Sequence, residues 1–144
     1  ALRGGLAQRG GFRAFVAHHH HGGVAQGGGA PAHVCMGGSW RMPSHEQQTE
    51  LISNCTETWT KQNGVNGILV TGKNGGQIFL PAAGDQWGYD LYDGEGFLGK
   101  YWSSSINPDY DHLAYYFSFR SDNRLLNYYY DSRYYGQSVR AVCP

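Results

Sequence analysis

The chain has 144 residues and a formal net charge of zero, from 11 basic and 11 acidic residues. This length suits one domain, and the balanced charge argues against a nucleic-acid partner. No apolar run approaches the ~20 residues that a membrane-spanning helix needs, so we expect no membrane insertion by this chain. No secretory signal is recognisable in it either.

Two compositional biases divide the chain. Of the 22 glycines, 11 lie in the first 38 residues, and eight of the 11 tyrosines lie between Tyr110 and Tyr135. Residues 1–36 are rich in Gly, Ala, Arg and Gln and include the histidine run His18–His21. Such a segment buries too little apolar surface to offset chain entropy, so we expect an irregular low-complexity arm with solvated histidines. The folded domain is predicted over residues 37–144.

The first element of that domain is a helix. Ser44 and Gln47 have the spacing of a capping box, which predicts a helix that ends near Asn54 or Cys55. Its buried stripe is supplied by Leu51, Ile52 and Cys55. Trp59 follows as an expected core aromatic.

The rest of the domain is predicted to be mostly β. Residues 67–71 and 77–80 are strand-like runs around the glycine-rich turn 72–76, which indicates a hairpin. Residues 82–99 are rich in Gly and Asp, and we expect a long ordered loop there. Further strands are predicted at 101–104, 114–119, 125–130 and 138–142. One or two helices with antiparallel strands and long ordered loops are typical of the α+β class.

Three cysteines, Cys35, Cys55 and Cys143, form no CxxC pair, which argues against a structural zinc site. Two interpretations stay open for them. Either Cys55 and Cys143 form a disulfide, or all three thiols are reduced.

Five motifs follow one another within residues 33–144. They are Gly37–Pro43, Trp59–Gly67, Ile78–Gly84, Tyr101–Ser105 and Gly136–Val142. In order and spacing they resemble the Fibrobacter-type major paralogous domain of Bacteroidetes-like surface proteins. That resemblance implies a C-type lectin-like fold, a fold that is also seen in formylglycine-generating enzymes. Residues 1–32 do not resemble this family.

Within that family, residues 101–144 resemble the variable region of proteins diversified by retroelements. Diversity-generating retroelements randomise adenines at the 3′ end of a target gene, so that Asn codons become Tyr, Asp, Ser or His codons. Residues 106–135 hold eight Tyr, four Asp, three Asn, three Ser and one His, which is the skew that such a process leaves. The alternative is an invariant bacterial cell-surface lectin-like or structural domain without diversification, because Tyr-rich segments also form ordinary strands.

The period of two in a strand assigns the side chains of residues 114–120 to two faces. One face is uniformly aromatic and is predicted to be core: Tyr115, Phe117 and Phe119. The other is chemically mixed and is predicted to contact a ligand: Tyr116, Ser118 and Arg120. Tyrosine suits a binding face because it offers a large contact area with few rotatable bonds. The full predicted ligand-binding set is Asn107, Asp109, Tyr110, Asp111, His112, Tyr116, Ser118, Arg120, Asn127, Tyr128, Tyr129, Tyr130, Asp131, Ser132, Tyr134 and Tyr135.

The alternative functions are catalysis and metal binding. We expect that the chain is not an enzyme and that it binds neither a metal ion nor a cofactor. A formylglycine-generating enzyme uses a pair of active-site cysteines that has no counterpart here. Ser103–Ser105, Asp111 and His112 supply the residue types of a triad without a nucleophile elbow. The acidic groups Asp90/Asp93/Glu95 and Asp109/Asp111 lack the sequence motifs of calcium-dependent lectins and are interpreted as solvated.

The sequence therefore predicts a receptor-like or adhesin-like binding protein. Its expected partner is a protein or a glycan on another surface, and its expected location is a cell surface or a phage particle.

Overall fold

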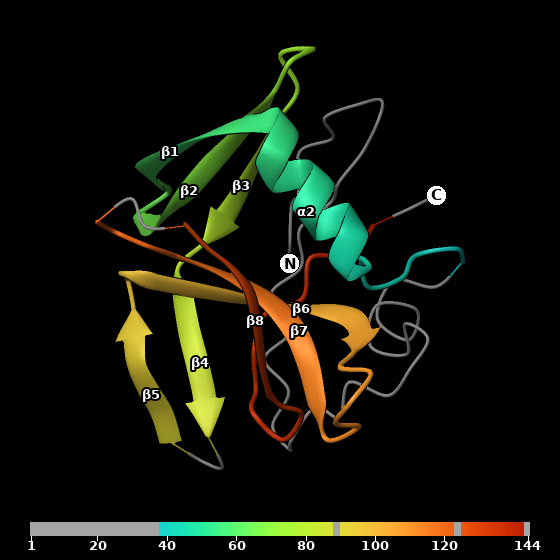
Figure 1. The fold of residues 1–144 in the computed structure, drawn as a ribbon. Helices are drawn as coiled ribbons and strands as arrows, with labels where there is room; N and C mark the ends of the chain where they lie inside the picture. Colours follow the sequence, from blue (N-terminus) through green and yellow to red (C-terminus); the bar gives the residue numbers. More distant parts are fainter. Residues whose placement is uncertain (1–37, 88–89, 123–124, 143–144) are drawn as a thin grey trace.

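The structure is a computed structural model that describes residues 38–87, 90–122 and 125–142. Within these ranges, the backbone alone is described for residues 86–87, 90–93 and 125–129. The arm expected at residues 1–36 and its histidine run lie outside the described residues. The described part is a mixed α+β structure with one short helix and two mostly antiparallel sheets (Figure 1).

Helix α2 (His45–Asn54) begins with the capping box that the sequence predicts. The Ser44 hydroxyl accepts a hydrogen bond from the Gln47 amide at 3.2 Å, and the Gln47 side chain accepts one from the Ser44 amide at 3.0 Å. Both bonds satisfy amides that the start of a helix leaves without partners. The buried Gln48 side chain donates to the Tyr101 carbonyl at 3.1 Å, which ties the helix to the larger sheet.

The smaller sheet has the strand order β1-β2-β3 and is antiparallel. Its strands are β1 (Cys55–Gln62), β2 (Val65–Gly72) and β3 (Gln77–Pro81). The β2–β3 hairpin confirms the predicted one, with Thr71 opposite Gln77 at its turn. The sequence interpretation misses β1, because that strand carries mainly polar side chains. Its available signal is the dipeptide Asn63-Gly64, whose φ angles of 48° and 82° suit a two-residue hairpin turn.

The larger sheet has the strand order β5-β4-β6-β7-β8. Its strands are β4 (Ala83–Trp87), β5 (Asp90–Glu95), β6 (Leu98–Ile106), β7 (Leu113–Arg120) and β8 (Leu125–Ser132). Neighbours are antiparallel except β4 and β6, which pair in parallel through Gly84 and Gly99. The strands predicted near residues 101, 114 and 125 are thus confirmed, each with wider bounds.

Two expectations about strands are wrong. Residues 82–99, expected to be a loop, contain β4 and β5. Gly and Asp have low strand propensity, so these strands owe their existence to pairing with each other and with β6. Residues 138–142, expected to be a strand, form only isolated bridges, Ser138 with Tyr101 and Val142 with Arg41.

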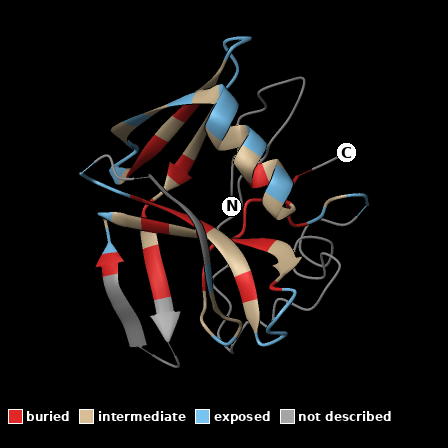
Figure 2. Cartoon of the chain, in the orientation of Figure 1, coloured by how far each residue is buried: buried red, intermediate tan, exposed pale blue. Residues whose placement is uncertain are grey.

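Two apolar clusters cover the two faces of the larger sheet. Adjacent residues of β6, Tyr101 and Trp102, point to opposite faces and belong to different clusters. The first cluster reaches the smaller sheet and comprises Ile68, Val70, Leu80, Ala82, Tyr101, Phe117 and Phe119. The second comprises Met42, Trp102, Ala114, Val139 and Ala141. Buried residues accordingly recur along β6 and β7 in Figure 2.

Cys55 carries a free thiol, so the disulfide with Cys143 that the sequence leaves open is not formed. Burial and the nearby Glu57 carboxylate raise the pKa of this thiol, which favours its protonated form. Cys35 and Cys143 lie outside the described residues. In the part of the chain that the structure describes, no helix has the length and apolar character to cross a membrane.

Candidate functional site

Strand β7 buries two of the three aromatic residues predicted for its core face. Phe117 and Phe119 are buried within the first apolar cluster, as expected. Tyr115 is instead half-buried, with its ring stacked on His45 at 4.4 Å and edge-on to Tyr130 at 6.2 Å. The prediction of a core role for Tyr115 is therefore wrong, because the first apolar cluster does not extend to this residue, although Ala114 beside it is buried in the second cluster.

The opposite face of β7, predicted to contact a ligand, is covered. Ser118 is only 3% exposed, and Tyr116 is half-buried with its ring edge-on to Trp102 at 5.8 Å. The cover includes the C-terminal segment, because Val139 and Ala141 belong to the second apolar cluster, against which the Tyr116 ring packs. The expectation that Ser118 is accessible is therefore wrong. Alternation assigns a side chain to a face but does not say whether another layer covers that face.

Arg120 is exposed but lies apart from the other exposed members of the predicted set. Arg120 is the last residue of β7 and lies opposite Leu98 of β6. Leu113 is the first residue of β7 and adjoins the loop that precedes this strand. The length of extended strand between these ends is ~23 Å. Three further predicted side chains lie outside the described residues: Asn127, Tyr128 and Tyr129.

Two loops meet at the Leu113 end of β7, one preceding that strand and one following β8. Arg133 joins them. Its amide donates to the His112 carbonyl at 3.0 Å, and its guanidinium donates to the Asp111 carbonyl at 2.9 Å. We call residues 109–112 and 133–134 together the loop surface.

The loop surface exposes aromatic rings. Tyr110 and Tyr134 are 56% and 55% exposed, and Tyr130 near the adjoining end of β8 is 52% exposed. The Tyr110 ring meets the His112 ring edge-on at 5.9 Å. Two exposed acidic residues belong to the same surface, Asp109 and Asp111. A concentration of exposed aromatic side chains marks a contact surface more often than an ordinary solvated one.

Asn107, predicted to contact a ligand, is buried, and its hydrogen bonds stabilise the loop that precedes β7. Its Oδ1 accepts hydrogen bonds from the amides of Asp109 at 2.9 Å and Tyr110 at 3.2 Å. The backbone amide of Asn107 donates to the Leu113 carbonyl at 2.9 Å. Asn side chains commonly stabilise turns in this way. The expectation that Asn107 is accessible is wrong, and its role is to fix the backbone that displays Tyr110.

Replacing this acceptor tests that role. Asn107→Ala is expected to lower the free energy of unfolding by about 1 kcal/mol, because it removes the acceptor of the part-buried amides of Asp109 and Tyr110. Asn107→Asp keeps the acceptor oxygen and should lose less stability than Asn107→Ala at a pH low enough to protonate the new carboxyl group. Urea unfolding of the three proteins gives the comparison. Equal stability of the Ala variant and the parent would show that the Asn107 bonds do not hold the loop.

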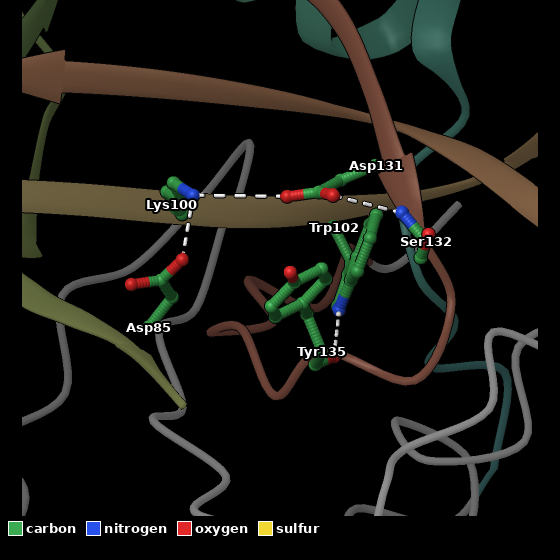
Figure 3. A network of polar contacts seen from close by, with 6 residues as sticks. All are labelled: Asp85, Lys100, Trp102, Asp131, Ser132 and Tyr135. Atoms are coloured by element: carbon green, nitrogen blue, oxygen red, sulfur yellow. Dashed lines mark hydrogen bonds and ion pairs between the residues drawn. The ribbon is translucent and has the colours of Figure 1, made fainter. Parts of the chain in front are cut away.

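A network of charged side chains centres on Lys100 (Figure 3). Its Nζ lies 2.6 Å from Asp85 Oδ2 and 3.7 Å from Asp131 Oδ2, and 5.4 Å from the centroid of the Tyr116 ring. The other Asp131 oxygen accepts a hydrogen bond from the Ser132 amide at 2.8 Å. Burial lowers the pKa of Lys100, but the hydrogen bond and charge of Asp85, together with nearby Tyr116 and Asp131, outweigh burial, so that its pKa is raised overall.

Three members of the predicted set thus have contacts inside the domain. Asp131 and Ser132 belong to the Lys100 network, and the Tyr135 carbonyl accepts a hydrogen bond from the Trp102 indole at 3.2 Å (Figure 3). Sequence reasoning misses the central pair of the network, Lys100 and Asp85. No local signal reveals it, because the two residues lie on different strands and meet only through the β4–β6 pairing.

The serines considered for a catalytic triad have structural partners. The Ser103 hydroxyl donates to the Tyr115 carbonyl at 2.8 Å, and the Ser105 hydroxyl accepts from the His45 amide at 3.0 Å. Both contacts lie where the register of β6 against β7 shifts. Among the described residues, no group of three or more His, Cys, Asp or Glu side chains could hold a metal ion.

The geometry defines a class of site: an exposed aromatic and acidic surface on two loops that are fixed to a sheet covered on both faces. Comparisons of the chain with protein-family models, curated proteins and solved structures find no match. The functional assignment therefore depends on this surface and on the sequence motifs.

Proposed function

We propose that the chain is a ligand-binding domain, and not an enzyme, that recognises a partner on another surface through its loop surface together with Tyr130 of β8. The observation that carries this proposal is the exposure of Tyr110, Tyr130 and Tyr134, each more than half accessible. Burying rings of this size against a partner removes a large apolar area from water at little cost in side-chain entropy.

The scaffold belongs, in this proposal, to the C-type lectin-like fold that the motifs resemble. Two of the five motifs lie mainly in the interior. Tyr101 and Trp102 open one of them with buried side chains, and Gln137 to Val142 are buried in the other. Buried motifs beside an exposed Tyr-rich segment suit a protein whose frame is constant while its surface changes.

The proposal extends to diversification by a retroelement and to display on a cell surface or a phage particle. The exposure of each side chain indicates which positions would tolerate substitution. Exposed members of the predicted set outside the interior contacts are Asp109, Tyr110, Asp111, His112, Arg120, Tyr130 and Tyr134. Asn107 and Ser118 are buried, and substitution there carries a cost in stability.

Sequencing the encoding locus tests the proposal. We expect a neighbouring reverse-transcriptase gene and a near-repeat of the 3′ end of this gene. Mismatches between the two copies should lie at adenines in the codons of the exposed positions and should spare the codons of Phe117 and Phe119. A locus without such a repeat would contradict diversification and leave an invariant lectin-like surface domain.

A further inference from the structure

Strand β1 lies at one edge of the smaller sheet (Figure 1). Within the described ranges, β2 is the one strand that pairs with it. The two-residue turn after β1 closes with the pair of Gln62 and Val65. Hydrogen-bonded pairs alternate along an antiparallel ladder from such a closing pair, so the amides and carbonyls of Glu57, Trp59 and Lys61 point to the edge away from β2. Backbone groups with this direction are a template for another strand.

The side chains of β1 make this strand complementary to a second copy of itself. When two copies pair antiparallel with Trp59 opposite Trp59, the Glu57 of each copy lies opposite the Lys61 of the other. This pair of opposite charges occurs twice, because the contact has two-fold symmetry. On the other face of the strand, Thr58 lies opposite Thr60, a pair that also stabilises antiparallel strands. Strand β1 contains no Gly or Pro that would interrupt the pairing.

Neither of these charged residues lies opposite a charge on β2. Glu57 pairs with Val70, and Lys61 pairs with Asn66. One carboxylate oxygen of Glu57 is buried and, among the described residues, has no hydrogen-bond partner. Burial raises the pKa of this carboxyl group. The Lys61 side chain is exposed. A second copy would therefore supply to each Glu57 a cation that the neighbouring strand does not supply.

We propose that the chain forms a symmetric dimer in which two copies of β1 pair antiparallel about Trp59 and join two three-stranded sheets into one. Trp59 is half-buried, with its ring edge-on to Phe119 at 6.3 Å, and the pairing places a second Trp59 beside it. The opposite edge of the sheet is less suited to pairing, because β3 has five residues and ends in Pro81, which has no amide to donate.

The dimer would leave the loop surface accessible. In Figure 1, β1 lies at the end of the molecule away from the loops that precede β7 and follow β8. Two copies joined at β1 would thus present two loop surfaces, and a partner with repeated epitopes would bind the dimer more tightly than a single chain. The dimer does not depend on the proposed binding function.

Sedimentation equilibrium of the full chain over a range of concentrations tests the proposal. One strand edge is a small interface, so we expect a dimer with a dissociation constant in the micromolar range. Lys61→Glu places a carboxylate opposite Glu57 twice in the dimer and should raise the dissociation constant by at least about tenfold. Lys73→Glu makes the same change of charge at an exposed position between β2 and β3 and should leave the dissociation constant unchanged.

A mixture of two charge variants tests the register of the strands. Glu57→Lys carries cations at both positions and Lys61→Glu carries carboxylates at both, so each should dimerise poorly by itself. Their equimolar mixture should form a heterodimer in which both opposite-charge pairs are restored. Glu57→Lys mixed with Lys73→Glu has the same net charges but restores one pair, and should associate more weakly. Should Glu57→Lys fail to fold, the comparison of Lys61→Glu with Lys73→Glu still decides the outcome.

In dilute solution, where the single chain prevails, Lys61→Glu and the parent should unfold at similar urea concentrations, because Lys61 is exposed. A monomer at every concentration up to about 1 mM would overturn the proposal. Equal dissociation constants for Lys61→Glu and Lys73→Glu would also overturn it, because the interface would then lie elsewhere. Neither result changes the proposed binding function, which does not depend on the oligomeric state.

Discussion

Phe119→Ala is expected to lower the free energy of unfolding by about 4 kcal/mol, the largest effect of any single truncation considered. Phe119 is 1% exposed, and its ring contacts those of Tyr101, Phe117 and Trp59 at centroid distances of 6.0 to 6.3 Å. Removing it leaves a cavity in the first apolar cluster, which joins the two sheets. Urea unfolding measures the change.

The chain offers a matched control for this truncation. Phe97 is 40% exposed, so Phe97→Ala removes the same atoms from a site that keeps much of its contact with water. Its cost should be about 1 kcal/mol or less. If both variants lost equal stability, the proposed packing of β7 against the smaller sheet would be wrong.

Lys100→Met is expected to lower the free energy of unfolding by about 3 kcal/mol at neutral pH. The change removes the cation that Asp85 and Asp131 share and leaves the buried Asp85 carboxylate uncompensated. Lys61→Met, at an exposed position of β1, is the control and should be nearly neutral. Chemical unfolding of both variants against the parent gives the difference.

The pH dependence of this effect has a defined sign. Folding raises the pKa of Lys100 above its ordinary value of 10.5, since Asp85 favours the charged amine. The stabilisation is therefore complete below the unfolded-state pKa and is lost as pH rises through the folded-state pKa. The stability gap between the parent and Lys100→Met should be constant near neutral pH and shrink above pH 10.5. A gap that persists at high pH would mean that lost packing, not charge, causes the destabilisation.

Local signals were sufficient for part of the fold. The capping box at Ser44 and Gln47 lies within one helical turn, and the β2–β3 hairpin closes through a short glycine-rich turn. Strands β4 and β5 escaped prediction because their Gly- and Asp-rich sequence contains no such signal. They form by pairing, and the parallel contact of Gly84 with Gly99 joins residues well separated along the chain.

The candidate site was predictable only in outline. The Tyr-rich composition pointed to the right region, and Tyr110, Tyr130 and Tyr134 are exposed there. Tyr116 and Ser118 were assigned to an open face that is in fact covered. No property of β7 itself reveals that cover, since it comes from residues 40–42 and 135–141.

By itself, the sequence determined the elements whose hydrogen bonds close over a few residues, and it determined which side chains of β7 share a face. Only the tertiary structure decided which faces are covered, which carboxylates Lys100 neutralises, and where the exposed tyrosines gather. The physical reason is that a cap or a turn is stabilised by adjacent residues, whereas burial and ion pairing depend on segments that folding brings together from distant parts of the chain.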